Sequence, residues 1–130
     1  MSLQAIPPRE WTAFLERVTR ERHTALVSIA CVSEGPVGVV EANDMPFRSV
    51  QMSTSPKGRA ISLEIGRRTA PPVLYLIPNP LALLSWVREG EEIVEVLGPR
   101  DTLTLLKFRS IPSEGLRQYP ERNASTPLCC

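Results

Sequence analysis

Short apolar runs separated by proline and glycine recur along this chain, and they predict a β-sheet. In Ile61–Ile65 the apolar residues alternate with Ser62 and Glu64, which is the pattern of a strand with one face toward solvent. Val73–Ile77 has no charged residue, so we expect this strand to be buried on both faces. The other runs of this kind are Ala25–Val32, Val37–Ala42, Phe47–Met52, Ile93–Leu97 and Thr102–Phe108.

Turn residues between the runs indicate how the strands pair. Glu34–Pro36 separates the first two runs and predicts a hairpin. Gly98–Asp101 separates the last two runs and predicts a second hairpin. Asn43–Pro46 interrupts the apolar pattern and is expected to lie between two strands.

Two segments have the features of helices. Trp11, Phe14, Leu15 and Val18 form one apolar stripe at helical spacing, so we expect a helix from about Pro8 to Arg22. A second, short helix is expected from about Pro80 to Glu89. It would start after Asn79 as the capping residue, carry Leu81, Leu84 and Val87 on an apolar side, and stop at Gly90.

Together these elements predict an α+β fold in which the sheet dominates. We expect five to seven short antiparallel strands bent into a small open barrel, with the N-terminal helix packed on it and the second helix following Asn79. One helix followed by strands is the order of SH3-like and Sm-like barrels, which is an analogy of fold alone. Residues 1–112 are expected to form a single globular domain, and 113–130 a flexible tail.

The composition argues against several classes of protein. The chain has 130 residues, 42% of them hydrophobic, and a formal net charge of +1. This balance is ordinary for a globular domain and gives no overall attraction to nucleic acid or to an anionic membrane. We find no signal-peptide pattern and no run near the ~20 apolar residues of a membrane span. A soluble, cytoplasmic protein without membrane contact is therefore expected.

Three motifs occur in order between Ile6 and Ser110. They are Ile6-Pro7 with Trp11 and Phe14-Leu15, then Ile77-Pro78-Asn79-Pro80, then Leu105-Leu106-Lys107-Phe108-Arg109-Ser110. These motifs resemble those of a small bacterial protein family known only as a domain of unknown function. The resemblance implies one fold unit over this range and no activity. Members of that family often carry His in the strand before the middle motif, but Val73–Ile77 has none, so a metal or acid–base role for such histidines does not transfer.

Few side chains are suited to catalysis or to metal binding. His23 is the single histidine and lies at the end of the first predicted helix, where we expect it to cap carbonyl groups rather than to act in catalysis. One histidine and no Cys-x-x-Cys pair predict no metal site, and no cofactor motif is present. Cys31 is expected to be a buried free thiol, and Cys129 and Cys130 an incidental reactive pair.

Large apolar residues around the second predicted helix suggest a surface for self-association. Leu83 and Trp86 lie on an apolar side that is wide for so short a helix, and Tyr75 lies on the strand before it. Aromatic residues are enriched in protein interfaces, although burial in the core explains Trp86 equally well. The leading hypothesis is a non-enzymatic interaction module that forms a homodimer, with Tyr75, Leu83 and Trp86 as candidate interface residues.

A first alternative is weak binding of single-stranded nucleic acid. Lys57 and Arg59 precede the predicted strand 61–65, and Arg67 and Arg68 follow it. Convergence of the two loops would give a site for a phosphate backbone. In a barrel, however, loops at the two ends of one strand lie apart, and their charges are then ordinary solvated ones.

A second alternative is an enzyme that uses carboxylates carried by strands. Glu41, Asp44 and Glu64 are the candidates for a general acid and base, provided that two of them converge. No nucleophile elbow or phosphate-binding loop is present, so we assign no catalytic residue and favour a protein without enzymatic activity.

Overall fold

The computed structural model describes residues 3–32, 39–67 and 69–110, which form one α-helix and an eight-stranded antiparallel sheet. Helix α1 covers Trp11–Arg22 and follows a 3-10 turn at Pro8–Glu10. The predicted α+β fold with a dominant sheet and an N-terminal helix is therefore confirmed. The strands are β1 (Gln4–Ile6), β2 (Leu26–Val32), β3 (Val39–Ser55), β4 (Gly58–Ile65), β5 (Val73–Pro78), β6 (Ala82–Arg88), β7 (Glu91–Leu97) and β8 (Leu103–Arg109).

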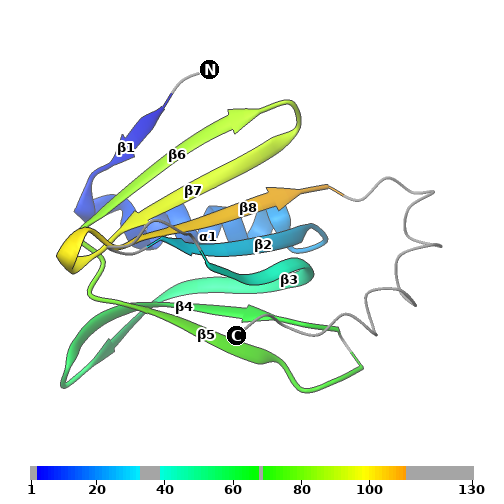
Figure 1. The fold of residues 1–130 in the computed structure, drawn as a ribbon, viewed down its shortest axis with the longest axis horizontal. Coiled ribbons are helices and arrows are strands. Elements are labelled where there is room, and N and C mark those ends of the chain that lie inside the picture. Colours follow the sequence, from blue (N-terminus) through cyan, green and yellow to red (C-terminus); the bar gives the residue numbers. More distant parts are fainter. Residues whose placement is uncertain (1–2, 33–38, 68, 111–130) are drawn as a thin grey trace.

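The strand order in the sheet is β1-β6-β7-β8-β2-β3-β4-β5. Two meanders, β2 to β5 and β6 to β8, are joined where β2 pairs with β8. Strands β6, β7, β8 and β2 converge near the linker from β5 to β6 and spread apart at the other end (Figure 1). Because β1 and β5 end the sheet and are not paired with each other, closure into a small barrel is not confirmed.

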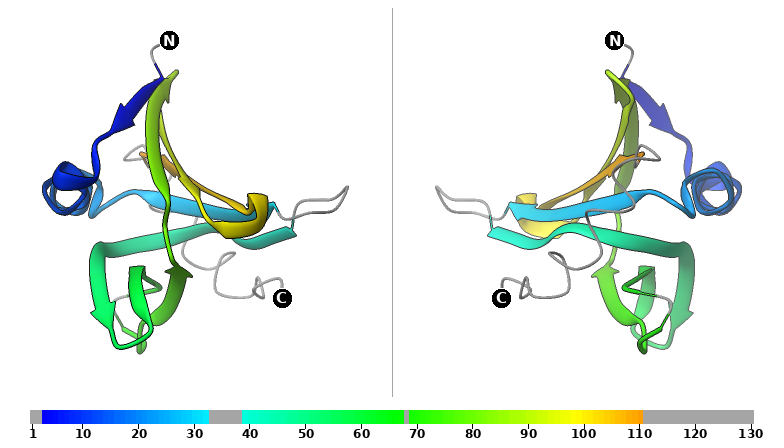
Figure 2. Two further views of the ribbon diagram at one scale, coloured as in Figure 1. Left: turned by 90° about the vertical axis from the view of Figure 1, so that its left-hand side faces the viewer. Right: turned by 90° about the vertical axis from the view of Figure 1, so that its right-hand side faces the viewer.

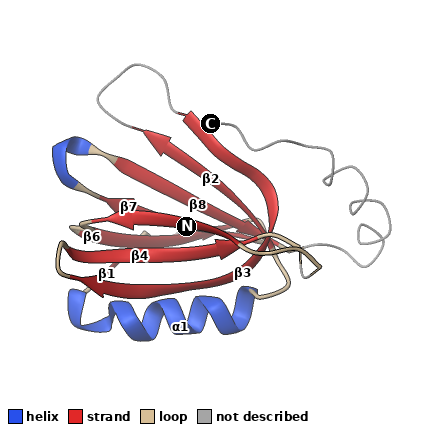
Figure 3. Ribbon diagram, turned by 90° about the horizontal axis from the view of Figure 1, so that it is seen from below, coloured by secondary structure: helices blue, strands red, loops and turns tan. Residues whose placement is uncertain are grey.

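The sheet is strongly bent, and its inner face encloses the core. In Figure 2, β6 to β8 form the upper part, β4 and β5 form the lower part, and α1 lies to one side of both. Seen from below, the axis of α1 runs along this side of the sheet (Figure 3). Phe108 of β8 meets Phe47 of β3 edge to face, with ring centroids 4.9 Å apart, and thereby joins the two meanders. Trp11, Leu15 and Val18 of the predicted helical stripe are buried in the same core.

Helix α1 also takes the place of a missing strand beside β3. The pairing of β3 with β2 runs between Val39 and Pro46, so the rest of β3 has no strand on that side. There Thr19 of α1 donates its hydroxyl hydrogen to the carbonyl oxygen of Val50 (2.8 Å) and accepts the N–H of Val50 (3.0 Å). Both backbone groups of Val50 are thus satisfied by one side chain.

Replacing Thr19 by valine tests this contact. Thr19→Val keeps the shape of the side chain but removes the partner of two backbone groups, so we expect the free energy of unfolding to fall by about 1–2 kcal/mol. The measurement is urea denaturation. Thr12→Val, at an exposed position of the same helix, is the control and should change stability by less than about 0.5 kcal/mol. Equal losses in the two variants would show that the Thr19 contact does not matter.

The second helix predicted for about Pro80–Glu89 is wrong, because this segment forms strand β6. Asn79 has φ 50°, which is left-handed, whereas a helix-capping residue is extended. Glu89 and Gly90, with φ 48° and 81°, form the turn between β6 and β7. Two successive positive φ values are typical of a tight hairpin turn. Because β6 has apolar residues on both faces, its sequence lacks the alternation of apolar and polar residues that is typical of a strand. The spacing of its apolar residues resembles that of a helical stripe instead.

Three predicted strands also differ from the structure. The described part of the first of these, Val39–Ala42, and the whole of Phe47–Met52 belong to one strand, β3, which passes through the predicted break with bulges and with a left-handed Asp44 (φ 49°). Val73–Ile77 is not buried on both faces, because β5 is an end strand with Leu74 and Leu76 exposed. The predicted pairing of β2 with β3 and of β7 with β8 is confirmed. The predicted tail 113–130, including its two cysteines, lies outside the described residues.

Candidate functional site

Four neighbouring strands share one face that points away from the core. Trp86 of β6 is directly opposite Ile93 of β7, which is opposite Lys107 of β8, so the three side chains lie on one side of the sheet. The residues that alternate with them, such as Leu83 and Val94, are buried on the inner side. We call the following set the outer face: Ala82, Leu84, Trp86, Ile93, Glu95, Leu97, Leu103, Leu105, Lys107, Ser28, Ala30 and Val32.

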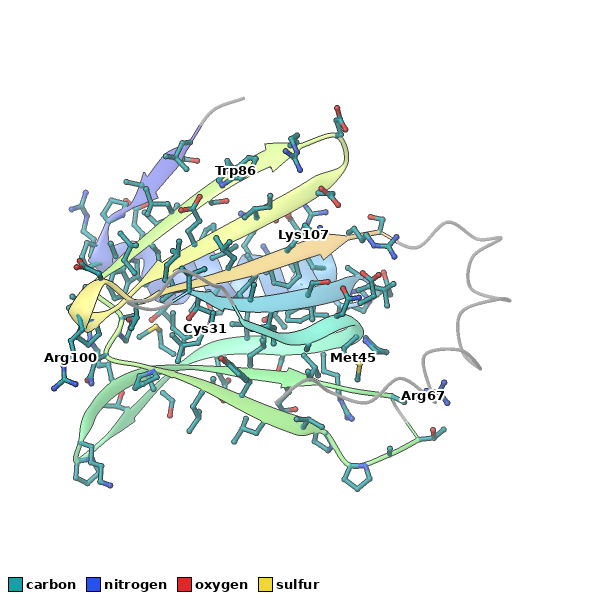
Figure 4. All side chains as sticks on the ribbon, viewed as in Figure 1. Cys31, Met45, Arg67, Trp86, Arg100 and Lys107 are labelled. Atoms are coloured by element: carbon teal, nitrogen blue, oxygen red, sulfur yellow. The ribbon has the colours of Figure 1, made fainter. Side chains whose placement is uncertain are left out.

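Apolar side chains make up most of the outer face. Its polar members are Glu95, Lys107 and Ser28. Most members are half-buried by their neighbours on the sheet, and helix α1 lies on the other side (Figure 2). Figure 4 labels two of them, Trp86 on β6 and Lys107 on β8. An antiparallel sheet with one face on its core usually turns a polar face to solvent, so an apolar face here requires an explanation.

Trp86 has a fixed orientation on this face. Its indole Nε1–H donates to Oε2 of Glu95 at 2.7 Å, and the guanidinium of Arg88 lies 5.6 Å from the ring centroid. A tryptophan that is held in this way loses little side-chain freedom on binding, which favours its use as an anchor. Trp86 thus remains a candidate interface residue, on a strand rather than on a helix.

The other two predicted interface residues lie elsewhere. Leu83 is fully buried in the core, because alternation along β6 turns it to the inner face, so its prediction as an interface residue is wrong. Tyr75 is on β5, at the opposite end of the strand order from β6, and packs against the core. The three residues therefore do not form one surface.

Charged residues border the outer face at its splayed end. Glu91 lies 3.8 Å from Arg88 and 3.9 Å from Lys107. Arg109 donates from Nε and Nη2 to the two carboxylate oxygens of Asp44, at 3.0 and 2.9 Å. This hydrogen bonding and the charge of Arg109 outweigh partial burial and hold the pKa of Asp44 below its ordinary value. An apolar centre with a charged border is the usual anatomy of a protein interface.

A buried carboxylate connects α1 to the inner face of the sheet. Glu92 of β7 is 2% exposed, and its two oxygens accept hydrogen bonds from both Arg17 amino groups (3.2 and 2.9 Å), from Arg22 Nε (2.9 Å) and from the Ser85 hydroxyl (3.2 Å). Burial alone would raise the pKa of Glu92, but the hydrogen bonds and charges of the two arginines lower it below its ordinary value. The network has the geometry of a structural clamp, because each carboxylate oxygen of Glu92 accepts two hydrogen bonds and at least one of the two comes from α1.

Sequence reasoning missed this network. The signal was the period-two pattern of Glu92 with Val94 and Val96, which places the carboxylate on the apolar face of its strand.

The basic residues predicted as a nucleic-acid site are not brought together. Lys57 lies in the turn before β4, and Arg59 is the second residue of β4. Arg67 follows the other end of that strand, where Figure 4 labels it. Arg59 places its guanidinium 5.0 Å from the ring centroid of the core residue Trp11. Arg67 has a buried Nη2 without a hydrogen-bond partner among the described residues. Arg68 lies outside them.

The candidate carboxylates do not form an acid–base pair. Asp44 is occupied by Arg109, and Glu64 lies on β4 opposite Ser49 and Leu74. The side chain of Glu41 is outside the described part of the chain. No cluster of His, Cys, Asp and Glu suited to a metal ion is found among the residues that the structure describes.

The two remaining candidates have simple roles. His23 is the C-cap of α1, and its Nδ1 lies 3.0 Å from the carbonyl oxygen of Arg20, so the predicted capping role is confirmed. Cys31 is a free thiol, but it is half-buried rather than buried, because it lines a cavity at the convergent end of the sheet. In the described chain, no helix has the length and apolar character that a membrane span requires.

Comparisons of the chain with protein-family models, with curated proteins and with solved structures give no match.

Proposed function

We propose that this chain is a non-enzymatic interaction module that self-associates through the outer face of its sheet. The observation that carries the proposal is the apolar character of this face on four adjacent strands, while the opposite face of the same strands already covers the core. A sheet that is apolar on both sides gains stability when its second side is covered as well.

A second copy of the chain is the occupant that the charges favour. Glu95 and Lys107 lie on neighbouring strands of the outer face, and they carry opposite charges. In a face-to-face dimer whose two-fold axis lies in the interface plane, Glu95 of one copy can meet Lys107 of the other, twice in the same interface. Four strands at normal spacing give ~400 Å² in projection, which is small beside the ~800 Å² per partner of a standard interface. We therefore expect a dimer with a dissociation constant in the micromolar range.

Replacing Leu105 by lysine tests the outer face. Leu105 lies in its middle, directly opposite Glu95, so a lysine there has an acidic neighbour in the monomer but puts an extra charge inside the dimer. We expect Leu105→Lys to weaken dimerisation at least tenfold, which is about 1.4 kcal/mol. The measurement is sedimentation velocity over a concentration series, with circular dichroism to verify folding.

The matched control is Leu81→Lys, which introduces the same charge at an exposed position outside the outer face. It should dimerise like the unchanged chain. A chain that stays monomeric at high micromolar concentration, or equal weakening by both lysines, would contradict the proposal.

The alternatives have less support. Binding of single-stranded nucleic acid would need basic residues that lie at opposite ends of β4 to act separately. An enzyme would need two candidate carboxylates to converge, whereas Asp44 is paired with Arg109 and Glu64 lies on β4 opposite Ser49 and Leu74. Membership of the bacterial family of unknown function, a cytoplasmic location and a small open barrel of the SH3 or Sm type remain parts of the proposal that rest on the sequence alone.

A further inference from the structure

Strand β5 ends the sheet with an edge that carries no charge. Val73–Pro78 contains no charged side chain, and its proline stands at the end of the strand. Leu74 and Leu76 are 57% and 54% exposed. Natural sheets usually protect such an edge with charges, bulges or proline, because an unprotected edge is a template for another strand.

The ladder with β4 determines which backbone groups of β5 point outward. The N–H of Asn79 donates to the carbonyl oxygen of Arg59 at 2.9 Å, in line with the register of the two strands. Hydrogen-bonded pairs alternate with other pairs in an antiparallel ladder, so Tyr75 directs its backbone groups to β4. Leu74 and Leu76 therefore direct their N–H and C=O groups away from the sheet. No partner for these groups lies among the described residues.

A cavity of about 500 Å³ opens beside this edge, between the end of β5 and the turn that joins β7 to β8. Tyr75, Ile77, Val96 and Cys31 contribute its apolar lining. Figure 4 shows Cys31 and Arg100 at this convergent end of the molecule. The volume is in the range of sites that take side chains or small ligands.

Arg100 supplies a positive charge at the cavity. It is exposed, and no carboxylate within the described residues forms an ion pair with it. Its turn is well fixed, because Gly98 N–H donates to Thr102 O and the Thr102 hydroxyl donates to Pro99 O, both at 2.9 Å. The guanidinium is therefore available to an anionic group next to an apolar pocket.

We propose that the β5 edge and this cavity bind an extended peptide segment of a partner protein. The guest strand pairs with Leu74 and Leu76 through its backbone. Its residues opposite Tyr75 and Ile77 place apolar side chains on the inner face, where the cavity lies. An acidic residue at the Pro78 end meets Arg100. Backbone hydrogen bonds supply affinity and the cavity supplies specificity, as in other cases of strand addition. This site is separate from the outer face and does not depend on self-association there.

The probe is a fluorescein-labelled peptide, Glu-Thr-Val-Thr-Val-Thr-Val-amide, whose valines face the cavity and whose glutamate faces Arg100 in the antiparallel register. Binding to the full chain is followed by fluorescence anisotropy. N-methylation of the second threonine, opposite Leu76, removes a hydrogen bond to β5 and should weaken binding at least tenfold. N-methylation of the second valine, opposite Tyr75, alters a group that points away from β5 and should change binding less than twofold.

The charge contact has its own test. Arg100 has φ 59°, so asparagine is the replacement that best keeps its left-handed backbone. We expect Arg100→Asn to weaken binding of the peptide about threefold to tenfold. If the peptide's glutamate contacts Arg100, replacing this glutamate by glutamine should not weaken binding to the Arg100→Asn variant any further. Arg20→Gln, at an exposed position on α1, is the control for net charge. Absence of binding, equal effects of the two methylations, or binding unchanged by Arg100→Asn would each overturn the proposal.

Discussion

Replacing Glu92 by glutamine is expected to lower the free energy of unfolding by about 3 kcal/mol. Glu92 is buried and accepts hydrogen bonds from Arg17, Arg22 and Ser85, so the neutral amide leaves two arginines facing a group that cannot balance them. Breaking a buried ion pair usually costs ~3–5 kcal/mol. The lower end applies here, because the side chains of Arg17 and Arg22 keep 31% and 22% of their exposure.

The dependence of this loss on pH identifies its cause. The pKa of Glu92 is lower in the folded chain than its ordinary value of 4.5, so the carboxylate stabilises the fold fully above pH 4.5. This contribution is lost as the pH falls through the folded pKa. The difference in stability between the unchanged chain and Glu92→Gln should therefore shrink below pH 4.5, which urea denaturation at several pH values measures.

Glu21 provides the matched control, because its Oε1 accepts from the same Arg17 at 3.0 Å but its side chain is 50% exposed. Glu21→Gln should cost less than about 0.5 kcal/mol. If Glu21→Gln and Glu92→Gln had similar effects, the clamp between α1 and β7 would not be the source of the stability.

Phe108→Ala is expected to lower the free energy of unfolding by about 4 kcal/mol. Phe108 has no exposed surface, and truncating a buried phenylalanine to alanine usually costs ~3–5 kcal/mol through lost burial and the cavity left behind. The loss here includes the edge-to-face contact with Phe47, which joins the two meanders of the sheet.

Two comparisons separate this effect from a general loss of aromatic surface. Phe108→Leu keeps most of the buried volume and should cost less than about 1.5 kcal/mol. Phe14→Ala removes a half-buried ring from α1 and should cost clearly less than Phe108→Ala. The measurement is urea denaturation followed by circular dichroism, and a Phe108→Ala loss below about 2 kcal/mol would contradict the assigned role.

The parts of the fold that could be predicted are those with a local signal. Helix α1 follows from the spacing of Trp11, Leu15 and Val18, and the β7–β8 hairpin follows from Gly98–Asp101. Strand β6 could not be predicted in the same way, because apolar residues on both of its faces remove the alternation. The positive φ of Asn79, which excludes it as a helix cap, depends on how β5 joins β6.

The candidate site depends on the register in which neighbouring strands pair, and this register cannot be read from the sequence alone. Trp86, Ile93 and Lys107 share a face only because three strands pair with particular alignments, and a shift by one residue would turn them to opposite sides. The period-two pattern places Glu92 on the apolar face of β7, but its two arginine partners depend on how α1 packs on the sheet. The free edge of β5 likewise follows from the strand order, which places an uncharged segment at the end of the sheet.

The strand order also makes the entropic cost of forming some strand pairs much larger than that of others. Each meander can form from its own turns, since its strands are neighbours along the chain. The pairing of β2 with β8 joins segments from opposite ends of the described chain, as Val27 and Phe108 show. The entropic cost of closing this large loop is offset by stabilising contacts only once the two strands meet. The β2–β8 contact, together with the equally long-range β1–β6 contact, therefore carries the largest loop-closure cost of the fold.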